Sequence, residues 1–450
     1  MYNRSLLGFN LGMSTFSILP HLSQSFSTVD LDALARKSGF MCRKARKITP
    51  RSFLLAVLTL ASQGAMALRI QAQLIGWFSE QSVSKQAVRK RAQKGRDYLK
   101  SVLQQLLDQR LHSAQKIPEV FKMFNRVLLA DSTTLALPQA LAWVFPGARN
   151  QCISARQSQL KIQCYYELLS DQMVHFELCS FRQNDQSASG HILPLCQPGD
   201  LVLRDLGYFV LDVFKQLAQR GCFFISRLRS NVALLDPASA EALDVLVELR
   251  GQSCLDRPVL MGRKLKLPVR LVAVKLPEEI AAKRRRQRKN NRDKRLRYTH
   301  RTKVLLGYEI FVTNLSVQQL DARQILSAYG LRWRIETLFK AFKQHLNLAR
   351  ISETTLYQLE LLIYSRLLLI TMLVNFVAGP IRAACSSLPN PPLSILKLLQ
   401  WHALFMPAFI LIDSVPKKNI LLRWTRQIPK HCSYEKRARL DFISCFQALS

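Results

Sequence analysis

The chain is long, moderately apolar and strongly basic. Its 450 residues would fill roughly three domains of ordinary size, and a hydrophobic content of 48% excludes a chain that is disordered throughout. Lysine and arginine number 65 against 30 aspartates and glutamates, a formal net charge of +35. Such an excess repels itself unless a polyanion compensates it, which indicates nucleic acid as the partner, with an anionic membrane surface as the alternative.

Local patterns argue against a disulfide-linked or zinc-binding scaffold, a secreted protein and a membrane-spanning protein. The ten cysteines include no CxxC pair and no clustered set of Cys and His ligands, which is typical of free thiols in a reducing compartment. The N-terminus lacks the charged, apolar and cleavage regions of a signal peptide. The apolar stretch 361–377 contains Arg366 and Asn375, so it predicts a buried core helix. We therefore expect a cytoplasmic protein with no membrane partner.

Residues 1–118 are predicted to form a helical region, because apolar residues recur there at helical spacing over 29–112. Ser84 can cap a helix whose first turns are cationic and include Arg89 and Arg91. This pattern is typical of the second helix of a helix-turn-helix, in which those arginines would contact DNA. An ordinary basic surface helix fits the pattern equally well.

From about residue 124 the hydrophobic period changes from helical to strand-like. Short strands, with one helix over 210–220, predict a mixed sheet covered by helices, which is an α/β fold. We assign this core to residues 119–228 and 303–380. The predicted strands cover 126–131, 159–169, 173–181, 201–205 and a further segment that begins at Cys222.

The segment 229–302 interrupts the core. Strand-like pieces alternate there with turn signals, so we expect a mainly β insertion. Its last part is strongly basic, because 283–303 holds twelve cations against the single acid Asp293. Such a run can contact a phosphate backbone, although a solvated surface is the commoner outcome. Beyond it we expect a long helix from about 317 to 346 and a smaller helical region over 381–450.

Carboxylates that directly follow predicted buried strands are the first candidates for functional residues. The chain has only 30 acids, and Asp131 and Asp205 each follow a run of apolar strand-forming residues. One such aspartate is usually a turn or helix cap. Two of them on neighbouring strands favour a divalent cation, because hard metals bind carboxylate oxygens and unneutralised carboxylates repel each other.

A third carboxylate lies in the long predicted helix. Tyr329, Arg332, Glu336 and Lys343 follow one another at spacings of three, four and seven residues. At about 100° per residue they share one stripe roughly 60° wide, with Lys340 at its edge. A glutamate flanked by cations and a phenol suits a metal-bound phosphodiester. The alternative, a solvated face with an Arg332–Glu336 ion pair, is less favoured beside two strand-end aspartates.

Three blocks of the sequence resemble the motifs of a known family. They are Asp131-Ser132-Thr133, the block from Arg204 to Phe209, and Tyr329-x2-Arg332-x3-Glu336-x6-Lys343. They are similar to the motifs of bacterial insertion-sequence transposases of the IS-four type, which are DDE enzymes with a ribonuclease H-like catalytic core. The resemblance covers about residues 120–380, and its third block is the most specific.

The resemblance implies a cut-and-paste DNA transposase. Asp131, Asp205 and Glu336 would be its catalytic triad and would hold two Mg²⁺ ions, which Mn²⁺ can replace. Tyr329, Arg332 and Lys343 would grip DNA near the scissile phosphate, with Lys340 as a further contact. Water would cut the transposon ends, and the resulting 3′-hydroxyls would attack target DNA. The alternative is a catalytically inactive or domesticated descendant that only binds DNA.

The resemblance also implies partners and a setting. The partners would be double-stranded DNA, both as terminal inverted repeats and as target, and a second copy of the chain in the DNA complex. The protein would be located in the bacterial cytoplasm, at the nucleoid. It implies too that 229–302 is the mainly β insertion that the family places between its second aspartate and its glutamate.

One departure from the family concerns tryptophan. Relatives that cut through a DNA hairpin stack a flipped base on a Trp of the insertion, and none of the five Trp here lies in 229–302. Tyr298, Tyr308 or Phe311 could take its place, with Tyr298 the best candidate because it lies inside the basic run; the alternative is that the hairpin step is absent. Trp333 is close to the triad in sequence, but we expect it to pack behind its helix.

Overall fold

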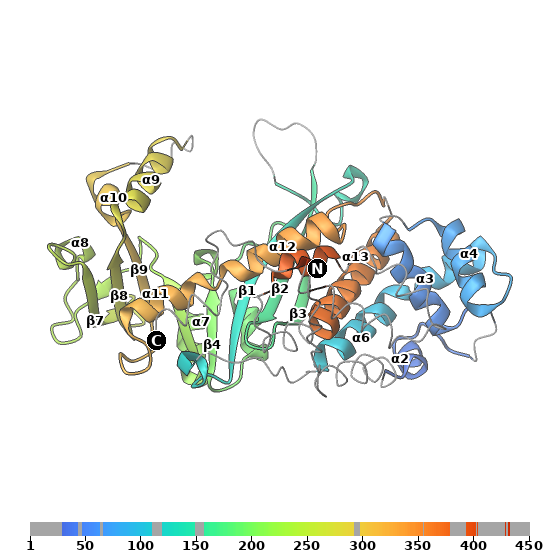
Figure 1. The fold of residues 1–450 in the computed structure, drawn as a ribbon, viewed down its shortest axis with the longest axis horizontal. Helices are drawn as coiled ribbons and strands as arrows, with labels where there is room; N and C mark the ends of the chain where they lie inside the picture. Colours follow the sequence, from blue (N-terminus) through green and yellow to red (C-terminus); the bar gives the residue numbers. More distant parts are fainter. Residues whose placement is uncertain are drawn as a thin grey trace, which may run out of the picture.

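The computed structural model describes residues 29–43, 47–63, 66–109, 119–148, 157–291, 298–353, 355–378, 393–401, 403, 428 and 431–432. Residues 292–297 of the basic run and most of the predicted C-terminal region 381–450 lie outside these stretches. The molecule is elongated, with the N-terminal helices at one end, the insertion at the other and the core between them (Figure 1).

One nine-stranded sheet runs through the core, in the order β3-β2-β1-β4-β5-β9-β8-β7-β6. β1 (Arg126–Leu137) pairs antiparallel with β2 (Ser158–Glu167), which pairs antiparallel with β3 (Gln172–Ser180). On its other side β1 pairs parallel with β4 (Asp200–Arg204), and β4 with β5 (Phe223–Arg227). These directions match the ribonuclease H-like mixed sheet predicted from the sequence.

The two faces of the central strands pack against different helices. Successive strand residues point to opposite faces, so Leu129 belongs to the core under α12 (Trp333–His345), and Ala130 to the core under α7 (Leu211–Gln219). A side chain on β1 can therefore be assigned to a face by counting from Leu129. Asp131, two residues later, lies on the α12 face.

The insertion continues the sheet of the core. β9 pairs antiparallel with β5 on one side and with β8 on the other, so the backbone hydrogen bonding passes from core to insertion. The described part of 229–302 forms helices as well as strands, and the basic run lies largely on α9 and α10, above the sheet in Figure 1. The elements of the insertion are β6 (Leu234–Leu235), α8 (Val245–Glu248), β7 (Cys254–Met261), β8 (Leu267–Lys275), α9 (Glu278–Lys289) and α10 (His300–Leu305), which extends to the first residues after it. β9 (Tyr308–Thr313) follows and belongs to the core.

The long helix predicted over 317–346 is two consecutive helices. α11 (Ala322–Gly330) begins after Asp321, whose side chain and that of Gln324 form a capping box. α12 begins at Trp333, and the two residues between the helices keep right-handed helical dihedrals. The stripe of Tyr329, Arg332, Glu336 and Lys343 therefore survives the break in the helix.

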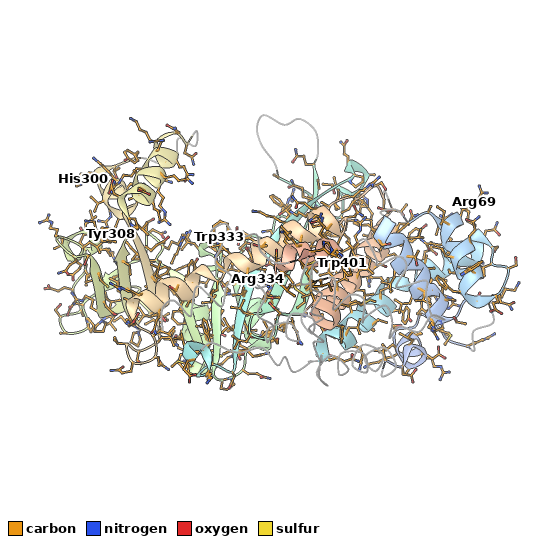
Figure 2. The ribbon with its side chains drawn as sticks, in the orientation of Figure 1. Arg69, His300, Tyr308, Trp333, Arg334 and Trp401 are labelled. Carbon is orange, nitrogen blue, oxygen red and sulfur yellow. The ribbon has the colours of Figure 1, made fainter. Side chains whose placement is uncertain are left out.

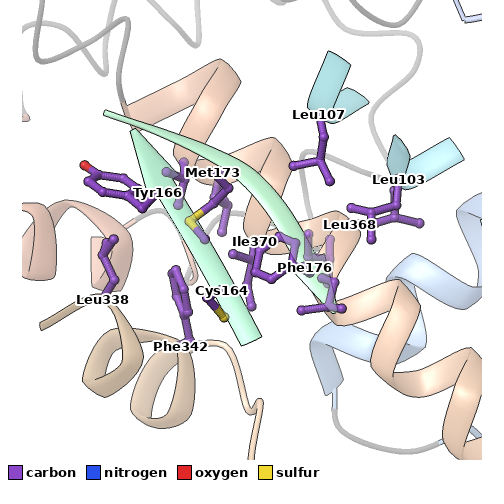
Figure 3. Close-up of a cluster of buried hydrophobic side chains, with 14 of the residues drawn as sticks. Leu103, Leu107, Cys164, Tyr166, Met173, Phe176, Leu338, Phe342, Leu368 and Ile370 are labelled. Carbon is purple, nitrogen blue, oxygen red and sulfur yellow. The ribbon is translucent and has the colours of Figure 1, made fainter. Parts of the chain in front are cut away.

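The N-terminal helices pack on the core through α13 (Leu356–Thr371), which contacts α3, α6 and β3. Figure 3 shows the resulting apolar cluster, with Leu103 and Leu107 of α6 near Phe176 of β3 and Ile370 of α13. The remaining helices are α2 (Leu31–Lys37), α3 (Pro50–Gln63), α4 (Leu68–Ser79), α5 (Lys85–Ala92) and α6 (Gly95–Asp108).

One helical segment, Leu356–Ala378, is long and apolar enough to cross a membrane by composition alone. However, 89% of its most apolar window is buried inside the fold. Its burial against the N-terminal helices and the sheet confirms the prediction of a core helix.

Candidate active site

Asp131 and Asp205 are brought side by side by the register of two parallel strands. Ala130 of β1 pairs with Arg204 of β4, so the next residue of each chain is one of the two aspartates. Both follow residues of the α12-facing core by two positions, Leu129 and Leu203, and therefore point to that face. β4 ends at Arg204, so Asp205 comes directly after its strand and caps the short 3-10 helix Leu206–Tyr208, whereas Asp131 lies within β1, which continues to Leu137.

Glu336 completes the set from the first turn of α12. The guanidinium of Arg332 joins the three carboxylates. Its Nη1 lies 3.4 Å from Oδ2 of Asp131, and its Nη2 lies 2.8 Å from Oε1 of Glu336 and 3.8 Å from Oδ1 of Asp205. The helix-face ion pair between Arg332 and Glu336 is thus present, but it is part of the three-carboxylate cluster and not of a solvated face.

Burial and crowding raise the pKa of Asp131 to about 6. Loss of solvation is the main cause, and the neighbouring carboxylates of Asp205 and Glu336 add to it. The backbone N–H of Ser132, which donates to Asp131 at 2.7 Å, and the charge of Arg332 act in the opposite direction. The site thus concentrates negative charge in a poorly solvated place, which is what a divalent cation relieves.

The donor set fits a hard divalent cation, because its ligands are carboxylate oxygens only. Within the described stretches, however, no three His, Cys, Asp or Glu side chains are already placed around one ion. Arg332 lies among the three carboxylates instead. The residues present are therefore of the right kind, and they would have to turn from the guanidinium to the ion.

The other residues of the stripe differ in exposure. Tyr329 is only 4% exposed, and its hydroxyl donates to the carbonyl of Arg204 at 3.2 Å. Burial is the main cause that raises its pKa to about 12. Nζ of Lys343 donates to the carbonyl of Thr134 on β1 at 3.2 Å, whereas Lys340 is exposed. The structure brings Lys343 against the strand of Asp131 and leaves Lys340 at the surface.

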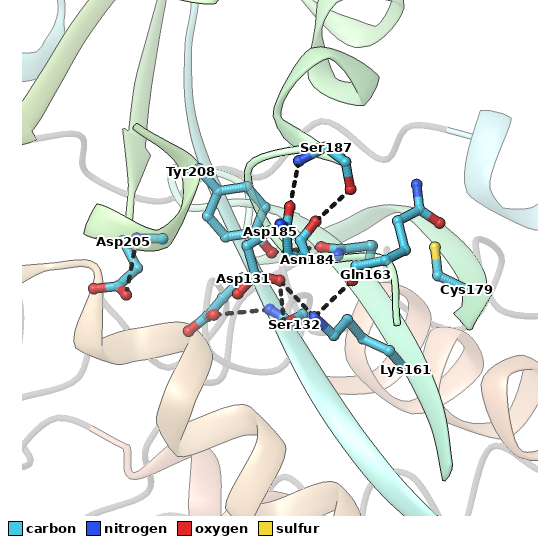
Figure 4. Close-up of polar contacts among 12 residues, drawn as sticks. Asp131, Ser132, Lys161, Gln163, Cys179, Asn184, Asp185, Ser187, Asp205 and Tyr208 are labelled. Atoms are coloured by element: carbon cyan, nitrogen blue, oxygen red, sulfur yellow. Dashed lines mark hydrogen bonds and ion pairs between the residues drawn. The ribbon is translucent and has the colours of Figure 1, made fainter. Parts of the chain in front are cut away.

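Behind Asp131 lies a polar cluster that the sequence did not indicate. Ser132 points to the opposite face of β1, where its hydroxyl donates to Oδ1 of Asp185 at 3.1 Å (Figure 4). Lys161 of β2 donates to the same oxygen at 3.0 Å, and Gly207 leaves room for the carboxylate. Asp185 lies in a polar loop, and no apolar run precedes it, so the pattern that identified Asp131 and Asp205 does not identify Asp185. The only signal for it is its contact in space with Ser132, a residue of the first motif.

Trp333 does not pack behind its helix, and that prediction is wrong. Its side chain is 58% exposed at the start of α12, where Figure 2 labels it. Its ring centre lies 5.7 Å from the guanidinium of Arg332. Tyr298 is also exposed, by 40%, at the edge of the described insertion.

The two predicted DNA contacts of the N-terminal region have different surroundings. In α5 the hydroxyl of Ser84 caps the helix by accepting from the backbone N–H of Ala87 at 3.2 Å, as the sequence indicated. Arg89 is exposed. Arg91 instead donates to the carbonyl of Phe40 and lies 5.1 Å from the centre of its ring, so it holds α5 against the helix bundle.

Between the insertion and the core lies a pocket of about 380 Å³ that is lined by apolar side chains and five arginines. It adjoins the candidate site through Leu206, the residue after Asp205. Glu309 is buried beside it and accepts from Arg227 at 3.0 Å and from Arg284. The five arginines are Arg227, Arg229, Arg263, Arg284 and Arg301.

Comparison with known proteins gives these positions a family context. Residues 122–372 match the family model described as "Transposase DDE domain". The chain is 29% identical to the transposase for insertion sequence element IS231B of Bacillus thuringiensis subsp. berliner, over 78% of this chain and 76% of that protein. It is 27% identical to the transposase for IS1151 of Clostridium perfringens, over 77% of each.

Two more distant similarities complete the comparison. The putative transposase InsL for IS186A of Escherichia coli K12 is 24% identical over 76% of this chain and 88% of that protein. A solved structure, the cryo-EM structure of piggyBac transposase synaptic complex with hairpin DNA, aligns with a TM-score of 0.45 and 10% identity over 94% of this chain and 87% of that chain. Since the family match covers more than half of the chain and includes Asp131, Asp205 and Glu336, this protein belongs to the DDE transposases of the IS-four type, metal-dependent enzymes that act on DNA.

Proposed function

We propose that this transposase works by cut-and-paste, with Asp131, Asp205 and Glu336 as its catalytic triad. One observation carries the proposal: side chains from β1, from the end of β4 and from α12 converge on the guanidinium of Arg332. These elements are far apart in sequence, and they bring together the carboxylates of the three motifs. Phosphoryl transfer at such a site needs no covalent enzyme nucleophile, because the attacking group is water or a DNA hydroxyl.

We propose Mg²⁺ as the ion, two per site, with Mn²⁺ as a substitute. Bound there, the ions would activate the attacking oxygen and stabilise the leaving oxygen of an in-line displacement. The chain itself keeps the carboxylates on one face and holds Lys343 against β1 at Thr134, within the same site. Arg332, Lys343 and Tyr329 are the proposed contacts to the phosphates around the scissile bond.

We propose that DNA extends from this site over both ends of the molecule. Support comes from exposed cationic and aromatic side chains, which include Lys340 on α12, Arg89 on α5 and Tyr298 in the insertion. Arg229 and Arg263, two of the arginines that line the pocket beside Leu206, add positive charge on the side of Asp205. The predicted contact of Arg91 with DNA would compete with its bond to Phe40.

A homodimer in the DNA complex follows from the same proposal. An element has two ends to cut, and the described part of one chain forms one such cluster of carboxylates. Two copies related by a two-fold axis would present one site to each end. We place this assembly in the bacterial cytoplasm, at the nucleoid, with no membrane partner.

The test uses the DNA that flanks this reading frame. A duplex that carries the terminal inverted repeat is incubated with the full chain and Mg²⁺, and the products are separated on denaturing gels. We expect nicks with 3′-hydroxyl ends and, with a supercoiled plasmid as target, joined products. DNA binding without any cleavage in Mg²⁺ or Mn²⁺ would instead support an inactive, DNA-binding descendant.

A further inference from the structure

Arg332 occupies the centre of the proposed metal site. Its two terminal nitrogens lie within ion-pair distance of all three carboxylates, at 3.4 Å, 3.8 Å and 2.8 Å. Oδ2 of Asp131 and Oε1 of Glu336, which face the guanidinium, are oxygens that a divalent cation would need. The guanidinium and the cation therefore compete for the same electron pairs.

The guanidinium cannot escape into water when it loses these partners. The side chain of Arg332 is 7% exposed, and its guanidinium lies near two aromatic rings, with ring centres 5.9 Å away at Tyr329 and 5.7 Å away at Trp333. Its Nε is buried and has no hydrogen-bond partner among the described residues. A guanidinium has five N–H donors, so this one keeps donor capacity for a further anion even in its present position.

We propose that Arg332 is a built-in counter-ion that holds the three carboxylates together until ions and DNA arrive, and that it then passes from the carboxylates to a DNA phosphate. This inference rests on the proposed catalytic triad. It gives Arg332 a positioning role in addition to its predicted phosphate contact: the arginine couples the binding of the ion to the binding of DNA.

The sign of the coupling follows from charge balance. Without DNA, an ion that binds the carboxylates leaves a buried guanidinium with no anion, which is costly. A phosphate that accepts the guanidinium removes this cost, so DNA raises the affinity for the ion. By linkage the ion raises the affinity for DNA by the same factor, and couplings of this kind typically amount to about 5- to 150-fold.

The experiment measures ion binding and not cleavage. Mn²⁺ binding to the full chain is followed by electron paramagnetic resonance, with and without a duplex of arbitrary sequence, and the duplex alone serves as the blank. For the wild type we expect weak binding alone and at least about fivefold tighter binding with DNA. Arg332→Gln should bind Mn²⁺ at least about fivefold more tightly than the wild type without DNA, and should gain less from DNA.

A matched control removes an equal charge nearby. Arg323 is exposed on α11, and Arg323→Gln should leave the Mn²⁺ affinity and its dependence on DNA as in the wild type. Arg332→Lys keeps the charge on one ammonium that cannot bridge three carboxylates, and its Mn²⁺ affinity without DNA should lie between those of the wild type and Arg332→Gln. If Arg332→Gln does not fold, which circular dichroism would show, the comparison of Arg332→Lys with the wild type decides.

The outcomes separate this inference from the proposed function. Mn²⁺ affinity that is unchanged or weaker in the folded Arg332 variants overturns the counter-ion role and leaves the triad intact. The triad itself fails if Asp131→Asn and Asp205→Asn bind Mn²⁺ as the wild type does. Equal DNA dependence in wild type and Arg332→Gln would also overturn the inference, because the coupling would then not pass through Arg332.

Discussion

Two cationic regions of this transposase use the same kinds of side chain in opposite ways. In the stripe on α11 and α12, Arg332 is buried and contacts three carboxylates, and Lys343 is bound to a strand carbonyl. In the basic run of the insertion, Lys283, Arg286 and Lys289 are exposed on α9. A dense run of exposed cations therefore indicates a partner, whereas one buried guanidinium that contacts three carboxylates indicates a site.

The run itself is not uniform. Arg284 donates to the buried Glu309, and Arg285 donates to Glu278 at 2.5 Å. Arg301 pairs with Asp244 at 2.8 Å. All three arginines already have carboxylate partners, and the pairs of Arg284 and Arg301 join α9 to β9 and α10 to the start of α8. The exposed members of the run are therefore the better candidates for phosphate contacts.

The largest effect is expected on the rate of end cleavage when one of the three buried-site carboxylates is replaced. Asp131→Asn, Asp205→Asn or Glu336→Gln should each lower the rate of end cleavage about a thousandfold or more, because residues that act as a unit in catalysis fail together. DNA affinity in a gel-shift assay without divalent ions should stay within a few-fold of the wild type, since each side chain is proposed to ligate an ion and not to contact DNA. A variant that still nicks at a near wild-type rate would lose its place in the triad.

The next prediction concerns how the stability of the apo protein depends on pH. Burial raises the pKa of Asp131 from 3.8 to about 6, so its ionisation costs stability: the cost is absent below pH 4 and complete above pH 6. Asp131→Asn should therefore stabilise the apo protein by on the order of 3 kcal/mol at pH 8, and by little at pH 4. Urea denaturation at both pH values measures this, with the exposed Glu241→Gln as control; equal effects at both pH values would contradict it.

A third prediction sharpens the contrast within the basic run. If the exposed cations contact phosphates, the triple change Lys283→Gln, Arg286→Gln and Lys289→Gln should lower the slope of log affinity against log salt by about 0.9 for each lost contact. The matched change Arg284→Gln and Arg285→Gln should leave the slope unchanged and lower the stability of the insertion. Fluorescence anisotropy at several salt concentrations measures the slopes. An unchanged slope in the triple variant would make the exposed run a solvated surface.

The smallest expected effect concerns the exposed aromatic residues. If the second strand is cut through a hairpin, Tyr298→Ala should reduce hairpin formation about tenfold and spare the first nick, because stacking on one base contributes about 1–3 kcal/mol. Trp333→Ala tests the other exposed ring on the same gels. Normal hairpin yield in Tyr298→Ala would remove Tyr298 from the step, and a wild type without hairpins would show that the second strand is cut by another route.

Much of the candidate site was visible in the sequence because it depends on local geometry. The spacing of Tyr329, Arg332, Glu336 and Lys343 gives one stripe on any helix, and it persists across the break before Trp333 because the intervening residues remain helical. The alternating and apolar runs of the core likewise gave β2, β3, β4 and α7 nearly at their observed bounds. Helical and strand periodicity depends only on residues that are close together in the sequence, so it can be predicted without the tertiary structure.

Other features were decided by tertiary structure alone, because they depend on contacts between distant segments. The sequence by itself identified the three candidate carboxylates, the family and the excess of basic residues that a DNA partner requires. Only the packed fold placed Arg332 among all three carboxylates, exposed Trp333 and set Asp185 behind Asp131. Pairing of β9 with β5 and β8 made the insertion part of the core sheet, and no local pattern encodes which strands will meet.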